Sequence, residues 1–101
     1  MKIGYIIASN EVMVDGKPVG YLYREEPDDE GDSGWRVFSG EESQEYADEA
    51  SNFAMYNAST VTAHDRTIVA VLGHAYPVAF ERDNDTGELV EVDDDNDTEG
   101  A

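Results

Sequence analysis

Few residues in this chain have the types and spacing of a metal site. His64 and His74 lie ten residues apart, so they do not form the i,i+4 pair that places two imidazoles on one helix face. Residues 83–88, Asp-Asn-Asp-Thr-Gly-Glu, have the composition of a calcium loop. They lack its third side-chain ligand before the glycine and its acid at the twelfth position. We predict a hairpin turn at 83–88, and neither a metal nor a cofactor.

Motifs of covalent and phosphate chemistry do not occur in the sequence. It has no cysteine, no glycine-rich phosphate loop and no Gly-x-Ser-x-Gly segment. Carboxylates are so numerous that no pair stands out as a catalytic acid and base. We predict that the chain is not an enzyme. A small enzyme built around Arg24, Glu25 and Trp35 is the open alternative.

The charge is strongly acidic and unevenly distributed. Twenty-four Asp and Glu against six Lys and Arg give a formal charge of −18, which disfavours nucleic acid and anionic membranes as partners. Residues 24–32, 33–50 and 81–101 sum to −5, −4 and −9, whereas residues 1–23 and 51–80 are neutral and hold most aliphatic residues. Two explanations stay open: adaptation to high salt, or complementarity to a basic partner.

Length and hydropathy limit what the chain can be. Its 101 residues suffice for one domain with a modest core. No apolar run approaches the ~20 residues that cross a bilayer, and residues 1–8 are too short for a secretory signal. The absence of cysteine fits a reducing compartment. We predict a cytoplasmic protein.

The elements expected in the first third of the chain are short strands. Residues 3–8 are apolar, with β-branched and aromatic side chains, which predicts a buried strand. Residues 18–25 alternate between two faces and predict a second strand, paired with the first. Residues 26–32 are acidic and rich in turn formers, so we predict an exposed, mobile loop before a third strand at 35–39.

Helices are expected in the middle of the chain. Ser39 and Glu42 have the spacing of a capping box, which predicts a helix from there to about residue 52. Its expected packing face consists of Tyr46, Ala50 and Phe53. Residues 57–72 predict two short helical turns, the second capped by Asp65.

The last third predicts a hairpin between residues 76–80 and 89–92. Strands at both ends with helices between them indicate an α+β fold. We predict a single small domain at residues 1–92, with a mostly antiparallel sheet of about four to five strands and helices packed on one face. A disordered acidic tail should follow at 93–101.

Three segments, residues 20–27, 32–42 and 79–83, combine aromatic, charged and glycine residues at close spacing. Together they resemble the bacterial immunity protein 33 family, first catalogued as a domain of unknown function, over roughly residues 3–92. The residues that carry the resemblance are Tyr23, Arg24, Glu25, Pro27, Asp32, Ser33, Gly34, Trp35, Arg36, Gly40, Phe80, Glu81 and Arg82.

The resemblance implies a non-enzymatic antidote of a polymorphic or contact-dependent protein toxin, with an α+β fold. For the motif residues we favour a structural role, because a motif shared by antidotes to different toxins specifies fold more naturally than contact. Trp is usually buried, and Arg24 and Arg36 have carboxylates within reach to pair with. Residues 76–78 depart from the family pattern and leave the partner's identity open.

The surface that contacts the partner is then expected among the variable acids. If the toxin has a basic active-site cleft, carboxylates can take the places of phosphates there. The predicted contact residues are Glu26, Asp28, Asp29, Glu30, Glu41, Glu42 and Glu45. The alternative function is an acidic housekeeping or regulatory domain of a salt-adapted organism, with no toxin partner.

Overall fold

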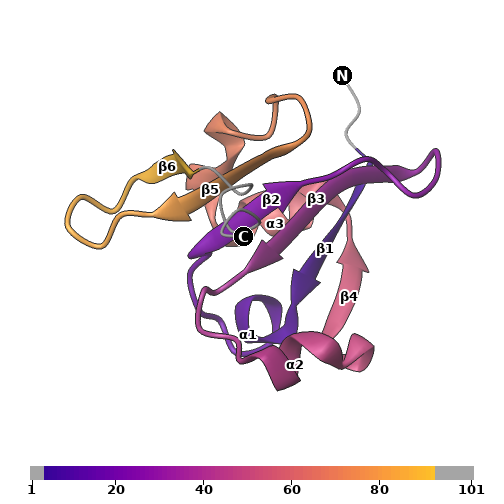
Figure 1. Ribbon diagram of the computed structural model, residues 1–101, viewed down its shortest axis with the longest axis horizontal. Helices are drawn as coiled ribbons and strands as arrows, with labels where there is room; N and C mark the ends of the chain where they lie inside the picture. Colours follow the sequence, from indigo (N-terminus) through magenta and orange to yellow (C-terminus); the bar gives the residue numbers. More distant parts are fainter. Residues whose placement is uncertain (1–3, 93–101) are drawn as a thin grey trace, which may run out of the picture.

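A six-stranded sheet forms the centre of the computed structural model, which describes residues 4–92 (Figure 1). The strands are β1 (Tyr5–Ser9), β2 (Tyr21–Arg24), β3 (Asp32–Phe38), β4 (Phe53–Tyr56), β5 (Val78–Arg82) and β6 (Leu89–Val92). Their order across the sheet is β4-β1-β3-β2-β5-β6, and only β1 and β3 are parallel neighbours. The α+β class is confirmed, with six strands where four to five were expected.

Short helices connect the strands. They are α1 (Asn10–Met13), α2 (Gln44–Asp48), α3 (Ala58–His64) and the 3-10 helices η1 (Ala50–Asn52) and η2 (Arg66–Ala70). Ser9 caps α1, Ser43 caps α2 and Asp65 caps η2, in each case with a side-chain oxygen that accepts a backbone N–H. The two helical turns predicted within 57–72, and Asp65 as the cap of the second, are confirmed.

The predicted pairing of the second strand with the first is wrong. β2 pairs with β3 on one side and with β5 on the other. β3 takes the place beside β1, because six of its seven residues are buried and such a strand belongs in the interior of a sheet. β3 also begins at Asp32, three residues before the predicted start.

The helix predicted from Ser39 to about residue 52 starts later than expected and is interrupted: α2 spans Gln44–Asp48, and η1 then continues to Asn52, where the helical segment ends as predicted. The Ser39 N–H does donate to the Glu42 carboxylate at 2.8 Å. However, Gly40 has a φ of 92° and turns the chain, so that α2 starts only at Gln44, behind its own cap. Phe53 starts β4 and does not lie on a helix. β4 and α1 were not predicted from the sequence pattern.

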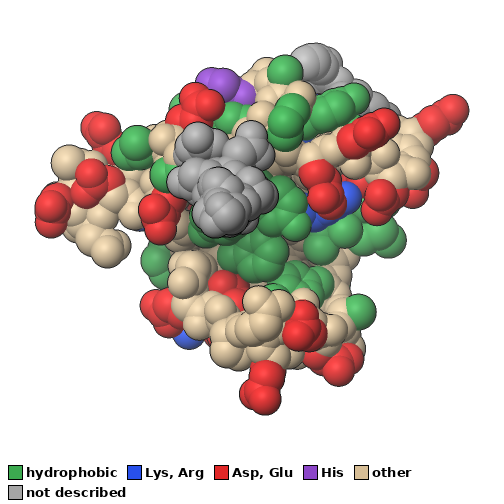
Figure 2. Space-filling view, viewed as in Figure 1, with side chains coloured by type: hydrophobic (Ala, Val, Ile, Leu, Met, Phe, Trp, Pro, Cys, Tyr) green, Lys and Arg blue, Asp and Glu red, His purple; other side chains and the backbone are tan. Residues whose placement is uncertain are grey.

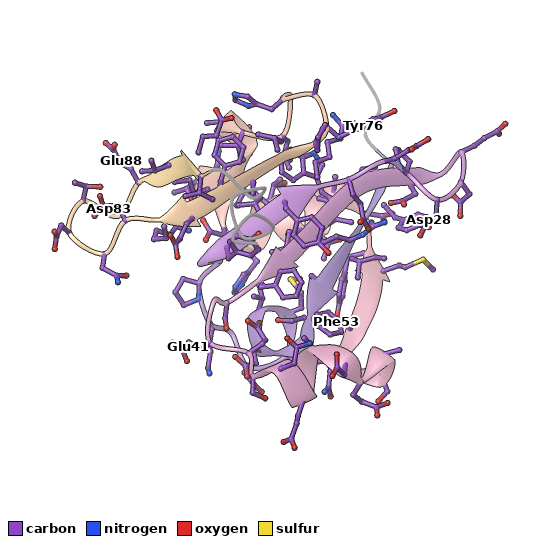
Figure 3. The ribbon with its side chains drawn as sticks, viewed as in Figure 1. Asp28, Glu41, Phe53, Tyr76, Asp83 and Glu88 are labelled. Carbon is purple, nitrogen blue, oxygen red and sulfur yellow. The ribbon has the colours of Figure 1, made fainter. Side chains whose placement is uncertain are left out.

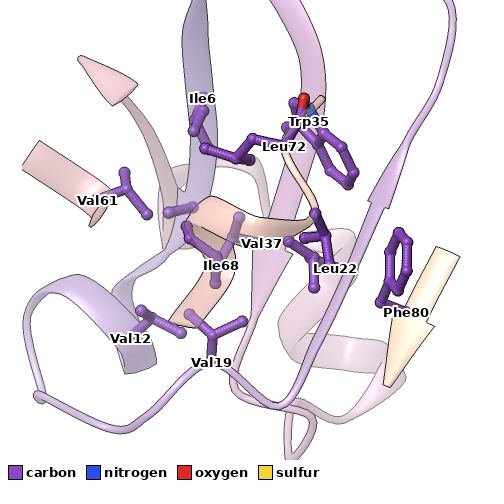
Figure 4. Close-up of a cluster of buried hydrophobic side chains, with 12 residues drawn as sticks. Ile6, Val12, Val19, Leu22, Trp35, Val37, Val61, Ile68, Leu72 and Phe80 are labelled. Atoms are coloured by element: carbon purple, nitrogen blue, oxygen red, sulfur yellow. Dashed lines mark hydrogen bonds between the residues drawn. The ribbon is translucent and has the colours of Figure 1, made fainter. Parts of the chain in front are cut away.

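The hydrophobic core lies between one face of the sheet and the helices α1, α3 and η2 (Figure 4). The sheet contributes Ile6, Leu22, Trp35, Val37 and Phe80, and the helices contribute Val12, Val61 and Ile68. Trp35 is fully buried, and its Nε1–H donates to the Leu72 carbonyl at 3.2 Å. The indole is therefore packed and also satisfied in its hydrogen bonding.

The predicted C-terminal hairpin is confirmed. The Asp83 N–H donates to the Glu88 carbonyl at 2.8 Å, and Gly87 has a φ of 78°, which suits glycine in such a turn. The acidic tail predicted at 93–101 lies outside the described residues. Among helices of the described residues, none has the length and hydropathy needed to cross a membrane.

Candidate functional site

A buried ion pair, Arg36–Asp32, lies in the segment of residues 20–42, which holds most of the motif residues. Arg36 Nη1 and Nη2 lie 2.9 and 2.8 Å from the two carboxylate oxygens of Asp32, and Glu25 accepts from Arg36 Nε at 2.8 Å. The side chains are 6% exposed for Arg36 and 0% for Asp32. The hydrogen bonds from Arg36 outweigh the opposing effect of burial and hold the pKa of Asp32 well below its usual range.

Asp32 also organises the backbone of the β2–β3 loop. Its carboxylate accepts the N–H of Asp28 at 2.8 Å and the N–H of Gly34 at 2.9 Å. Gly34 has a φ of 88°, and a Cβ at this position would collide with the carbonyl oxygen of Glu25. The close approach of the two strands therefore requires glycine at this position.

Arg24 lies on the core side of the sheet, beside Trp35. Its Nε donates to the Ser33 carbonyl at 2.8 Å and its Nη1 to the His74 carbonyl at 2.7 Å. The guanidinium carbon is 5.9 Å from the centroid of Trp35 and 5.4 Å from that of Tyr76. Arg24 thus fastens the segment before β5 to the sheet.

The remaining motif residues lie along the sheet and its turns. Phe80 packs on Trp35 with ring centroids 6.4 Å apart. Arg82 Nη2 lies 2.7 Å from Asp65, whose pKa stays below its ordinary value because hydrogen bonds and Arg82 outweigh burial. Pro27 is half-buried, Gly40 turns the chain, and Glu81 is exposed. Most motif side chains therefore have partners within this fold, which is compatible with the structural role predicted for them; that role stays a prediction.

The acidic loop between β2 and β3 is held by hydrogen bonds. Asp29 accepts the Tyr5 hydroxyl at 3.1 Å and the Gly31 N–H at 2.9 Å. Asp28 lies 3.7 Å from Arg36 Nη2. The side chains of Glu26, Asp28, Asp29 and Glu30 are all exposed. Their predicted role in binding is compatible with this exposure and stays a prediction.

The three predicted contact residues near α2 have different surroundings. Glu41 and Glu45 are exposed, and Glu41 lies 2.9 Å from Lys17 Nζ. Glu42 is half-buried and accepts from Ser9 Oγ at 2.6 Å and from the Ser39 N–H at 2.8 Å. Burial opposes its ionisation, but these hydrogen bonds and that of Gly40 prevail, so the pKa of Glu42 is lowered. Glu42 is thus a fixed anion.

The two predicted acidic groups do not form one patch. Figure 3 shows Asp28 and Glu41 on different sides of the sheet face that lies opposite the core, with Phe53 between them. Figure 2 shows hydrophobic side chains gathered in the middle of this face and Asp and Glu side chains around it. The acids are therefore arranged as a rim, and the centre of the face is apolar.

The apolar centre is a chain of aromatic rings. Ring centroids are 5.9 Å apart for Tyr23 and Phe38, 5.5 Å for Phe38 and Phe53, and 6.1 Å for Phe53 and Tyr46 of α2. Tyr21 lies 6.0 Å from Phe38. All five are half-buried. The sequence patterns did not predict this second apolar face, although the alternation of Tyr21 and Tyr23 along β2 is the feature that could have indicated it.

Two adjoining hollows follow these rings. The larger has about 440 Å³ and is lined among others by Ile7, Arg36 and Phe53. The smaller has about 250 Å³ and is lined among others by Tyr21, Glu42 and Glu81. Phe38 and Ala47 line both, so the hollows form one feature, the aromatic groove.

The histidines have backbone partners. His64 Nε2 is 2.9 Å from the Lys17 carbonyl, and His74 Nδ1 is 3.1 Å from the Val71 carbonyl. Within residues 4–92, no group of three or more His, Cys, Asp or Glu side chains is placed to hold a metal ion.

Comparison with known proteins identifies the family. No curated protein and no solved structure is significantly similar to the chain. The family described as Immunity protein Imm33 domain matches residues 6–93, which include the six strands except for Tyr5, the first residue of β1, and the whole Arg36–Asp32 cluster. This confirms the resemblance found in the sequence: the chain belongs to the Imm33 immunity protein domain family.

Proposed function

We propose that this protein is the antidote of a bacterial protein toxin and neutralises it by stoichiometric binding, without catalysis. The observation that carries the proposal is the family match over residues 6–93, almost the whole described chain. A match of this extent leaves the binding surface to be sought on the immunity domain itself.

The distribution of charge supports a basic partner. Residues 4–92 contain nineteen Asp and Glu. Those within 4.0 Å of a Lys or Arg nitrogen are Glu11, Glu25, Asp28, Asp32, Glu41 and Asp65. Most carboxylates of the described chain are thus not neutralised internally. Such a surface accelerates association with a basic protein and repels acidic ones.

In this proposal the seven predicted acids act at the rim of the interface. The loop acids and those near α2 steer a basic toxin towards the sheet face between them. If the toxin is a nuclease, its phosphate-binding Lys and Arg are the groups that the carboxylates meet. Neutralisation then follows because the bound antidote blocks access to the cleft.

Titration of the toxin tests both the binding and the absence of catalysis. The resemblance to antidotes implies that the toxin is encoded beside this chain, so the probe is a toxin domain from a neighbouring gene, with its own activity as the readout. We expect complete inhibition at one antidote per toxin and recovery of a one-to-one complex by gel filtration. Complete inhibition by a small fraction of one equivalent would show turnover. No inhibition and no complex with any neighbouring toxin would refute the proposal.

A salt-adapted domain without a toxin partner is the second candidate, favoured by the charge of −18 and the presence of only two Lys. Its acids would serve hydration at high salt. Unfolding of the chain in dilute buffer and refolding on addition of molar salt would support it. A fold that is stable in dilute buffer favours the antidote.

A further inference from the structure

The aromatic groove combines an apolar floor with one anionic end. Phe38 and Ala47 lie where its two hollows join. At one end are Glu42 and Glu81. At the other end is Arg36, whose charge is met by Asp32 and Glu25 at 2.8 Å each. The cation of the groove is therefore neutralised within the fold, whereas Glu42 and Glu81 have no Lys or Arg within 4.0 Å among the described residues.

We propose that the aromatic groove is the docking site for a basic segment of the toxin. An Arg or Lys side chain of that segment lies with its aliphatic stem on Phe38 and its charged end at Glu42 and Glu81. This inference rests on the proposed function and deepens it, since it names the part of the antidote that makes the central contact. The loop acids of residues 26–30 then act in steering only.

The chemistry of the groove selects such a side chain. Long cationic side chains bury an apolar stem against rings while their charge stays at a polar end, and aromatic faces attract cations. Glu42 accepts hydrogen bonds from Ser9, Ser39 and Gly40 and so stays ionised in its half-buried position. A charge held in place loses little freedom when a partner binds. Interfaces of this kind have an aromatic centre with a polar rim.

A second copy of the chain fits the groove poorly. Two such faces would bring Glu42 and Glu81 of one molecule near the acidic rim of the other, and each molecule carries a formal charge of −18. Like charges brought together at an interface cost affinity. The occupant that complements the groove is therefore a basic one from a different protein.

A peptide titration tests the groove without the toxin. The probe is acetyl-Arg-Leu-Arg-amide, added to the isotope-labelled full chain and followed by NMR, with acetyl-Glu-Leu-Glu-amide as the control. We expect shifts centred on Phe38, Ala47 and Phe53 with the basic peptide only, at millimolar affinity. Shifts confined to residues 26–30, equal shifts with both peptides, or no shifts in the groove would overturn the proposal.

Substitutions test the same surface against the toxin itself. Ala47 is exposed on α2 and lines both hollows, so Ala47→Arg fills the groove and places a cation at its acidic end. Ala63→Arg is the matched control, because Ala63 is exposed on α3, which packs on the other face of the sheet. Thermal unfolding of both variants shows that each is folded before binding is measured.

We expect Ala47→Arg to bind an inactive variant of the toxin at least about tenfold more weakly than wild type, and Ala63→Arg to bind as wild type. Glu81→Gln should weaken binding about fivefold, whereas Glu88→Gln on the hairpin should not. If Ala47→Arg and Glu81→Gln both bind the toxin with wild-type affinity, the groove is not the docking site. The proposed antidote function is not affected by that result. If the wild-type protein binds no toxin, the proposed function is refuted. The peptide titration then still tests whether the groove binds a basic segment.

Discussion

The two faces of the sheet are made of different residues and covered differently. On one face, Trp35, Leu22 and Ile6 are fully buried under α1, α3 and η2. On the other, Phe38 is half-buried and Met55 is 64% exposed. Figure 1 shows the same division, with α3 behind the sheet and α2 at its lower edge. Among residues 4–92, therefore, the first face is covered by helices and stabilises the fold, whereas the second, uncovered face stays partly exposed.

The division passes between neighbouring residues of the family motif. Trp35 and Arg36 are adjacent in β3, and because side chains alternate along a strand they lie on opposite faces. Trp35 enters the core, and Arg36 lines the aromatic groove. A short motif can thus contribute to the core and to the candidate interface at the same time.

The largest expected effect is at the centre of the covered face. Trp35→Ala should lower the free energy of unfolding by about 3–5 kcal/mol, because it leaves a cavity under the helices and removes the bond to Leu72. Urea unfolding followed by circular dichroism measures the loss. Trp35→Phe is the control and should lose less, since it keeps most of the buried area. A loss below about 1 kcal/mol in Trp35→Ala would contradict the assignment of Trp35 to the core.

A second large effect is expected at Asp32, the partner of Arg36. It would show that residues on the uncovered face of the sheet also stabilise the fold. Asp32→Ala should lower the free energy of unfolding by about 3 kcal/mol, because it leaves Arg36 buried without its bidentate partner. Asp28→Ala is the matched control, since this carboxylate is 78% exposed and lies 3.7 Å from the same guanidinium. Its effect should stay within about 0.5 kcal/mol. Equal effects would contradict the structural role of Asp32.

Acid should weaken the same cluster. The pKa of Asp32 is lowered in the folded chain, so the unfolded chain takes up the proton first. The stability that Asp32 contributes is therefore complete above its ordinary pKa of 3.8 and is lost as the pH falls below that value. Urea unfolding from about pH 6 to about pH 3 should show a smaller loss in Asp32→Asn than in wild type. The comparison cancels the general change in net charge, and parallel curves would contradict the prediction.

The smallest effect is expected on the exposed part of the uncovered face. Met55→Ala should change the free energy of unfolding by less than about 0.5 kcal/mol, because the side chain is already 64% exposed. Leu22→Ala, a similar truncation on the covered face, should cost about 2–5 kcal/mol. Chemical denaturation of both variants gives the contrast. Similar losses would show that the two faces do not differ as described.

Local features of the fold were predictable from the sequence. The hairpin around Gly87 and the cap at Asp65 depend on residues that are near one another in the chain, so their chemistry is complete within a short segment. Tyr46 and Phe53, which were predicted to share the packing face of one helix, do lie together, with ring centroids 6.1 Å apart. Their contact is made between α2 and β4, since Gly40 and the Ser43 cap shorten the helix. The residue spacing thus indicated that Tyr46 and Phe53 pack on the same side, but it placed Phe53 on a helix, whereas Phe53 starts a strand.

The sequence by itself determined the family, the α+β class and the role of the local turns. The tertiary structure alone decided that β3 lies between β1 and β2, that Asp32 is the buried partner of Arg36, and that the aromatic rings meet on the uncovered face. The physical reason is that strand order depends on which distant segments pair, and period-two alternation does not encode the partner. Until the order is fixed, a strand's two faces cannot be assigned to core or surface, and an acidic side chain cannot be assigned to a rim or to an ion pair.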